Sequence, residues 1–304
     1  MIENSALTAG LYFVDSTFWR HTVWYILLGI TTIIELFFIL RKVKNRKLII
    51  AIYLTISGLT FFLEMIIYSY FKSYQYFPML IPQSPSDDSI AGNLFSQFSV
   101  CATALLIAVY KLKYYWYLIF AAAYGAIEEI FLMLGIYKHN WYQTWMTIIG
   151  LLLVFWITKK IYLKATNRIT PFWRYIFIFF GLTALHQHII VWVQRLVGIR
   201  VLSESFLPDA EQSMVVLSAI NNLLLGVPIM IIHFSHTKWR WRILVISVLY
   251  GAFYAAAKLD LVIYKEGWFL ISSSVCIWSM YIFTYIFDKL YGPIDNNSLV
   301  LKRV

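Results

Sequence analysis

Long apolar stretches separated by short polar connections dominate the chain. A helix needs about 20 apolar residues to cross the hydrocarbon core of a bilayer. Nine stretches approach or exceed this length, at residues 22–41, 49–71, 92–111, 115–137, 142–163, 173–193, 213–236, 242–264 and 268–290. The pattern predicts an all-α protein, a polytopic helical membrane bundle with about nine transmembrane helices.

The composition points to the same class. Of the 304 residues, 61% are hydrophobic, 19% aromatic and only 13% charged, with a mean hydropathy of +0.71. Soluble globular domains carry about 25% charged residues, so that class is excluded. The N-terminal sequence lacks the pattern of a removable signal peptide, and we expect the first span to direct its own insertion.

The net charge of +10 comes with an uneven distribution of basic residues. Of the 25 lysines and arginines, 18 fall in the segments after the first, third, fifth, seventh and ninth predicted spans or at the span ends next to them, 6 fall on the other side and 1, Lys258, falls well within a span. Such an excess marks the cytoplasmic side. We therefore expect a multi-pass protein of the cell membrane, with its N-terminus outside, its C-terminus cytoplasmic and no nucleic-acid partner.

An internal repeat is visible in short motifs. Tyr124-Gly125 recurs 126 residues later as Tyr250-Gly251, and Gly58-Leu59-Thr60 recurs 123 residues later as Gly181-Leu182-Thr183. Two matches at nearly one offset indicate a duplication. The predicted organisation is an N-terminal outer segment with a leading helix and basic loop (1–48), four-helix repeat A (49–168), four-helix repeat B (169–291) and a cytoplasmic tail (292–304). An even number of spans in each repeat makes the repeats parallel.

Repeat A, and repeat B less closely, resembles the small uncharacterised four-helix membrane proteins of spore-forming Firmicutes. The resemblance rests on Glu64 in an early span, on Pro82 with Pro85 in an outer loop, and on the turn from Tyr137 to Trp141. Repeat B departs from it with Gln187 where repeat A has Glu64. The resemblance implies the architecture and a bacterial plasma membrane, and it carries no activity.

Polar residues inside the predicted spans are the candidate functional residues. A charged group at this depth is costly, by roughly 3 kcal/mol on insertion scales, and is seldom kept without a role. With the predicted topology, nearly all of them fall in the outer half of the bundle, where they indicate a pocket for a lipid-like or small-molecule ligand from the outer side. They are Glu64, Glu128, Glu129, His186, Gln187, His188, Asn222, Lys258 and Asp260.

Helical periodicity restricts which of these residues share a face. Tyr124 and Glu128 are four residues apart and stack on one side of their helix, whereas Glu129 turns about 100° away. Tyr250, Tyr254 and Lys258 form a similar stripe in the eighth span. We therefore expect Glu128 to pair with Lys258 across the bundle, with the tyrosines supporting them.

Metal or cofactor chemistry finds little support in the sequence. His186 and His188 are two residues apart, so on a helix they point about 200° apart and do not form an i, i+4 ligand pair. Cys101 and Cys276 both fall within spans and lack metal-site spacing. We expect neither a metal nor a cofactor, and the sequence does not identify a protein partner.

Three functions remain open. The first is an intramembrane enzyme acting on a lipid-like or isoprenoid amphiphile, with Glu64, Glu128 or Asp260 as general acid or base. This design is loosely similar to integral-membrane terpene cyclases, although their Trp-Glu-x-x-Tyr pattern reads Leu63-Glu64-Met65-Ile66-Ile67-Tyr68 here. The second is a proton- or cation-coupled transporter, and the third is a non-catalytic sensor, immunity or assembly protein. A buried network that only fixes helix register would explain the same residues.

Overall fold

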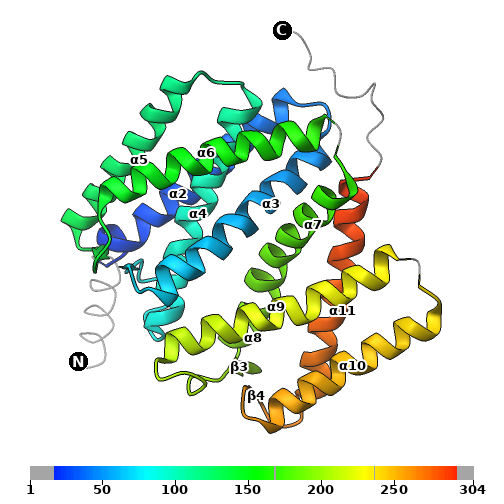
Figure 1. The fold of residues 1–304 in the computed structure, drawn as a ribbon. Helices are drawn as coiled ribbons and strands as arrows, with labels where there is room; N and C mark the ends of the chain where they lie inside the picture. Colours follow the sequence, from blue (N-terminus) through cyan, green and yellow to red (C-terminus); the bar gives the residue numbers. More distant parts are fainter. Residues whose placement is uncertain (1–16, 168, 236, 293–304) are drawn as a thin grey trace, which may run out of the picture. The chain divides into compact units, whose positions relative to one another are not determined.

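The computed structural model describes residues 17–167, 169–235 and 237–292, and within this part the chain forms nine long apolar helical spans (Figure 1). The all-α prediction is confirmed. Residues 1–16 of the predicted outer segment and residues 293–304 of the predicted tail lie outside the described residues. In chain order, with η for a π-helical turn, the elements are η1 (Phe18–Thr22), α2 (Val23–Lys42), α3 (Arg46–Glu64), η2 (Met65–Tyr70), β1 (Tyr74–Tyr76), α4 (Pro85–Val109), α5 (Tyr114–Leu134), β2 (Tyr137–His139), α6 (Thr144–Thr166), α7 (Pro171–Leu185), η3 (His186–Val191), α8 (Trp192–Leu196), β3 (Arg200–Leu202), α9 (Ala210–Phe234), α10 (Trp239–Lys258), β4 (Val262–Tyr264) and α11 (Phe269–Leu290).

Local caps explain where several helices begin and end. The Asn45 side chain accepts a hydrogen bond from the backbone of Leu48 at 3.1 Å and caps α3. Pro85 begins α4 seven residues before the predicted span, because proline is favoured in the first turn of a helix. α5 ends at Leu134, and Gly135 caps it with a φ of 71° that suits glycine. α10 ends at Lys258, so Asp260 lies beyond the helix rather than within the predicted span.

Backbone contacts divide the protein into two compact units, and each is described by itself. Among the described residues, the first unit comprises 17–43 and 72–162, and the second comprises 44–71 and those from 163 to 292. α3 therefore packs in the second unit, although α2 and α4 belong to the first. The predicted repeats are defined by sequence rather than by contact, and their boundaries stay a prediction.

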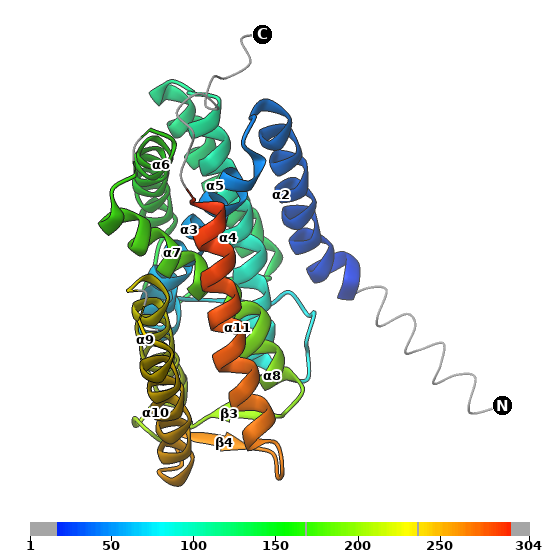
Figure 2. The same cartoon turned by 90° about the vertical axis from the view of Figure 1, so that its right-hand side faces the viewer.

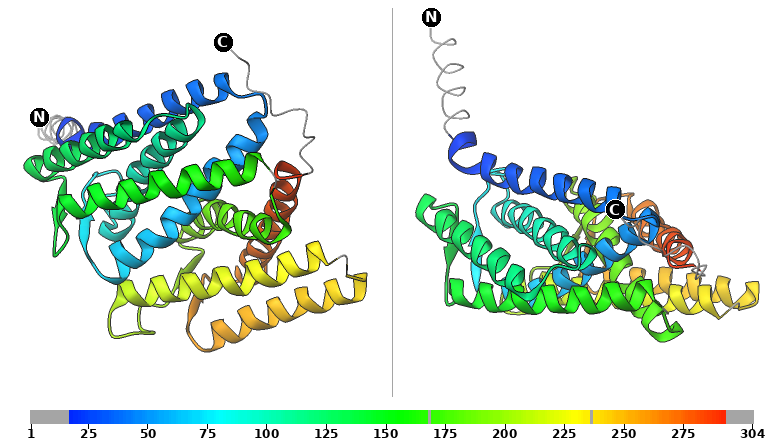
Figure 3. Two further views of the ribbon diagram at one scale, coloured as in Figure 1. Left: turned by 45° about the horizontal axis from the view of Figure 1, so that its top comes forward. Right: turned by 90° about the horizontal axis from the view of Figure 1, so that it is seen from above.

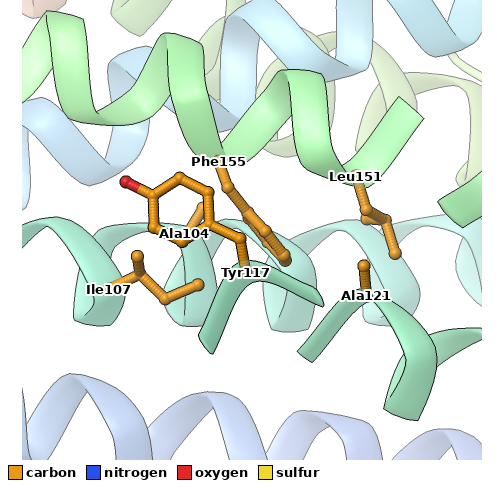
Figure 4. Close-up of a cluster of buried hydrophobic side chains, with 6 residues drawn as sticks. All are labelled: Ala104, Ile107, Tyr117, Ala121, Leu151 and Phe155. Atoms are coloured by element: carbon orange, nitrogen blue, oxygen red, sulfur yellow. The ribbon is translucent and has the colours of Figure 1, made fainter. Parts of the chain in front are cut away.

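The first unit has an aromatic and aliphatic core between α4, α5 and α6. Ala121 and Phe155 are completely buried there, and the ring of Tyr117 lies edge-on to that of Phe155 with 6.1 Å between centres (Figure 4). The amino-terminal end of α2 joins this unit through Tyr25, whose hydroxyl donates to the carbonyl of Ile136 at 2.6 Å. These contacts fix α2 and α5 against the loop that carries β2.

Close helix packing organises the second unit. Gly58 of α3 lies so near the backbone of α7 that a methyl group at this position would overlap with the carbonyl oxygen of Phe180. Thr55 donates to the carbonyl of Phe177 at 2.9 Å and shares a 2.8 Å hydrogen bond with the hydroxyl of Tyr291. Burial raises the pKa of Tyr291, which keeps this hydroxyl protonated. α9 and α10 run side by side in opposite directions (Figure 3).

The described residues include four short strands, which the hydropathy pattern did not predict and which form one antiparallel pair in each unit. β1 pairs with β2, with Tyr74 opposite His139. β3 pairs with β4, with Arg200 opposite Tyr264 (Figure 2). Apart from the additional helix α8, the same order of elements occurs in both halves of the sequence: β3 begins 126 residues after β1, and β4 begins 125 residues after β2.

Large apolar side chains are exposed along the helices of both units. Ile33, Met133, Leu153, Ile231 and Val248 each have more than half of their surface accessible. So many exposed large apolar side chains are unusual on a soluble monomer and suit contact with lipid. Together with the nine apolar spans of the described chain, it makes this a multi-pass membrane protein.

Candidate functional site

A carboxylate and an imidazole meet at the end of α5. Gly135 reverses the chain after α5, and the pairing of β2 with β1 returns His139 towards the helix. The Nε2 atom of His139 lies 2.7 Å from Oε1 of Glu128. The side chains are 17% and 11% exposed, so the pair is largely buried but still open to a molecule at this surface.

Aromatic rings surround His139. Its ring lies edge-on to Tyr137 and Tyr142, with centres 5.1 and 5.9 Å apart. Tyr74, opposite His139 in the strand pair, packs against both of these tyrosines at 5.4 and 4.9 Å. The rings hold the imidazole in one orientation, so the carboxylate of Glu128 meets a fixed nitrogen.

The neighbouring carboxylate points elsewhere, as the 100° rotation per residue predicts. Glu129 is exposed, and its Oε1 accepts a hydrogen bond from the hydroxyl of Thr144 at the start of α6. Only one of the two adjacent carboxylates therefore takes part in the pair with His139.

Tyr124 belongs to a second network, which links α2, α4 and α5. Its hydroxyl lies 2.8 Å from the hydroxyl of Ser99 and 2.9 Å from that of Thr103. Thr103 in turn contacts both carboxylate oxygens of Glu35, at 2.7 and 2.9 Å.

In the second unit, three predicted polar residues occupy the π-helical turn η3. His186 is completely buried, and its Nε2 lies 3.3 Å from the carbonyl oxygen of Cys276. Gln187 donates to the hydroxyl of Ser218 on α9. The His188 ring lies edge-on to Phe61 of α3, with centres 4.0 Å apart. The three side chains thus contact three different helices, and π-helical turns of this kind are frequent at functional sites.

A buried arginine that the sequence analysis did not select lies beside η3. Arg200 of β3 is 3% exposed. It donates to Oδ1 of Asn221 at 2.7 Å and to the sulfur of Cys276 at 3.2 Å. That sulfur lies 3.5 Å from Oε1 of Gln194. We call Arg200, His186, Gln194, Asn221 and Cys276 the Arg200 cluster.

The predicted residues of α10 lie on the outside of their unit. Tyr254 and Lys258 are exposed, and the Lys258 ammonium lies 5.6 Å from the centre of the Tyr254 ring. Tyr250 shares a 2.6 Å hydrogen bond with Ser274. Asp260 is exposed and has a φ of 52° in the turn after the helix. Lys258 and Glu128 belong to different packing units, and their pairing stays a prediction.

The remaining two predicted residues are in the second unit. Glu64 is the last residue of α3, half-buried next to η2, and has interaction partners of its own. Asn222 is buried on α9, and its Oδ1 meets no hydrogen-bond partner among the described residues. Within each unit, the structure therefore separates the predicted residues: Glu128 and Tyr124 have different hydrogen-bond partners, whereas Glu64, Asn222 and Asp260 lie at the end of α3, on α9 and after α10.

A separate apolar groove runs between the middle of α7 and the last half of α9. It has a volume of about 660 Å³. Its lining includes Phe179, Phe180 and Met230, and Pro228 lies within the same part of α9. Apart from Tyr175 and Ser235 the lining is apolar, so the groove suits hydrocarbon.

Among the described residues, the structure contains no cluster of three or more histidine, cysteine or acidic side chains that would hold a metal ion. Comparison of the chain with family models, with curated proteins and with solved structures found no match. The class that the fold defines is therefore a multi-pass membrane protein, and its function has to be argued from the sites themselves.

Proposed function

We propose that this protein is an intramembrane enzyme that performs acid–base chemistry on a lipid-like or isoprenoid amphiphile, with Glu128 and His139 as the reactive pair. The observation that supports the proposal is the 2.7 Å contact between the two side chains in a largely buried but open position. Glu128 is the carboxylate that the sequence analysis favoured, and His139 follows it by 11 residues.

The chemistry follows from the two nitrogens of the imidazole. The Nε2–H group donates to the Glu128 carboxylate, which fixes the tautomer and leaves Nδ1 to take a proton from a substrate. The carboxylate stabilises the imidazolium that then forms, as in other carboxylate–histidine pairs. Such general acid–base catalysis contributes about 10²- to 10⁴-fold in rate.

The proposed setting is a bacterial plasma membrane, with the strands on the outer side. Each span reverses the side of the chain, so the segments after the second, fourth, sixth and eighth spans, which contain the four strands, share one face. The excess of basic residues on the other face supports a cytoplasmic location for it. The near-equal spacing of β1 to β3 and of β2 to β4 supports an origin by internal duplication.

A proton- or cation-coupled transporter is the second candidate. Its support is the pair of π-helical turns within the spans that contain α3 and α7, because such turns are frequent at functional sites and transporters bind substrates at irregular parts of helices. A sensor would show neither turnover nor flux.

A double-mutant cycle tests the proposed pair. Glu128→Gln, His139→Gln and the double variant are reconstituted into vesicles of bacterial total lipid extract, and mass spectrometry follows every lipid species over time. Because the pair acts as one unit, each single variant should lose most of the turnover and the double variant should lose little more. Glu266→Gln, which removes an exposed carboxylate from the turn after β4, is the control and should keep its turnover.

Additive losses in the cycle would contradict a coupled pair. An unchanged lipid profile in the wild-type vesicles, combined with pH-dependent uptake of a solute, would favour the transporter instead. An unchanged profile without any uptake would favour the sensor.

A further inference from the structure

Arg200 lies buried without an acidic partner. Its guanidinium remains charged at any pH that a folded protein experiences. Both of its hydrogen-bond partners, Asn221 and Cys276, are neutral side chains, and among the described residues no carboxylate forms an ion pair with it. A buried charge is normally paired, because its removal from water is otherwise uncompensated.

Polar atoms beside Arg200 also lack partners. Within the part of the chain that the structure describes, the Nε of Arg200, the Nδ2 of Asn221 and the Nδ1 of His186 are buried and form no hydrogen bond. Buried polar groups are satisfied in the great majority of native structures. The Nε of Arg200 and the Nδ2 of Asn221 are N–H donors. Besides the positive charge of the guanidinium, the cluster therefore has free hydrogen-bond donors for an anion.

The neighbouring rings determine how an anion would approach. The guanidinium carbon lies 5.1 Å from the centre of the Phe253 ring and 6.0 Å from that of Tyr264. Aromatic contacts of this kind occupy the faces of a guanidinium and leave its edge for hydrogen bonding. The unpaired Nε–H group is on that edge, and Asn221 already binds there through its Oδ1.

We propose that the Arg200 cluster binds the carboxylate group of a monoanionic ligand. One carboxylate oxygen would accept the Nε–H of Arg200, the one guanidinium nitrogen without a partner among the described residues, and the unpaired Nδ2–H of Asn221 would donate to the carboxylate as well. A single negative charge is favoured over a phosphate dianion because Arg200 is the one cationic side chain of the cluster. A fatty-acid-type amphiphile and a small soluble carboxylate share this chemistry.

This site goes beyond the proposed function. It belongs to the second unit, whereas Glu128 and His139 belong to the first. The two proposals therefore fail or succeed separately, and each has its own variants and readout.

The test uses the purified full-length protein in an uncharged detergent, with sodium oleate, oleyl alcohol, sodium acetate and inorganic phosphate as probes. The readout is the midpoint of thermal unfolding, followed by tryptophan fluorescence, together with retention of radiolabelled oleate. We expect a saturable increase in the midpoint with a carboxylate probe. In Arg200→Gln the apparent affinity should fall by more than about tenfold, because the site loses its charge. Arg195→Gln, an identical change five residues earlier on α8, should bind as the wild type does.

The probes separate the two sources of the carboxylate. Stabilisation by oleate but not acetate would identify an amphiphile, whereas equal stabilisation by acetate would identify a soluble carboxylate. Equal binding by the wild type and Arg200→Gln would overturn the proposal, as would stabilisation by phosphate alone. If Arg200→Gln does not fold, the wild type alone still tests the proposal through the comparison of oleate with oleyl alcohol. Equal stabilisation by the two probes would refute a carboxylate site.

Discussion

The close packing of α3 against α7 predicts that Gly58→Ala destabilises the protein. Gly58→Ala adds one methyl group, and it would overlap with the carbonyl oxygen of Phe180. A side chain in this place could rotate away, but a backbone carbonyl moves only if the whole helix moves. Overpacking of this kind costs about 1 to 3 kcal/mol, which outweighs the gain of up to about 1 kcal/mol from replacing glycine in a helix.

Gly251→Ala is the matched control. Gly251 lies within α10 of the same unit, is exposed, and has no neighbouring atom within 4 Å of an added methyl group. The same substitution should therefore be neutral or stabilising there. The loss of stability in Gly181→Ala should lie between those of Gly58→Ala and Gly251→Ala. The added methyl group would overlap with the ring of Phe287, and a side-chain ring is able to tilt.

Unfolding in detergent, followed by the fluorescence of the 12 tryptophans, measures all three variants. We expect Gly58→Ala to lower the free energy of unfolding by up to about 2 kcal/mol, which is the cost of overpacking less the gain from replacing glycine in a helix. If Gly58→Ala and Gly251→Ala had equal effects, the close contact between α3 and α7 would be wrong.

Three further predictions follow. Asp88→Asn should destabilise the protein by about 1 to 3 kcal/mol in the same unfolding assay, because the buried carboxylate accepts three backbone hydrogen bonds, from residues 79, 80 and 81 at 3.0, 2.6 and 2.7 Å. Tyr124→Phe should cost about 1 kcal/mol, because it removes the hydroxyl between Ser99 and Thr103; an unchanged stability would argue against that network. Lys138→Cys should react with an impermeant thiol reagent from outside intact cells and Lys44→Cys should not, and the reverse result would invert the topology.

Hydropathy predicted the number of spans because each long apolar run has few alternatives to a transmembrane helix. The ends were less accurate. α4 starts at Pro85 rather than near residue 92, since its first turn is polar and includes Asp87 and Asp88. The eighth span was expected to reach residue 264, but α10 ends at Lys258 and β4 follows.

Sequence patterns did not predict the strands or the partners of the polar residues. β1 and β2 are three residues each and pair across about 60 residues of chain, so no local periodicity indicates them. Glu128 was selected as a charge within an apolar run, but its partner His139 approaches only because the chain reverses at Gly135. Arg200 was missed because it lies between two spans, where a basic residue is ordinary. The one sequence signal that could have identified Arg200 was its position among the few basic residues of the predicted outer side.

The most direct test of the proposed chemistry is the identity of the molecules that co-purify with the protein. Mass spectrometry should compare lipids and small apolar molecules bound to the wild type, to Glu128→Gln and to the control Glu266→Gln. If Glu128 and His139 act on an amphiphile, Glu128→Gln should retain an unreacted species that the wild type and the control convert. Identical profiles for all three proteins, with unchanged stability, would show that the pair only holds α5 and β2 together.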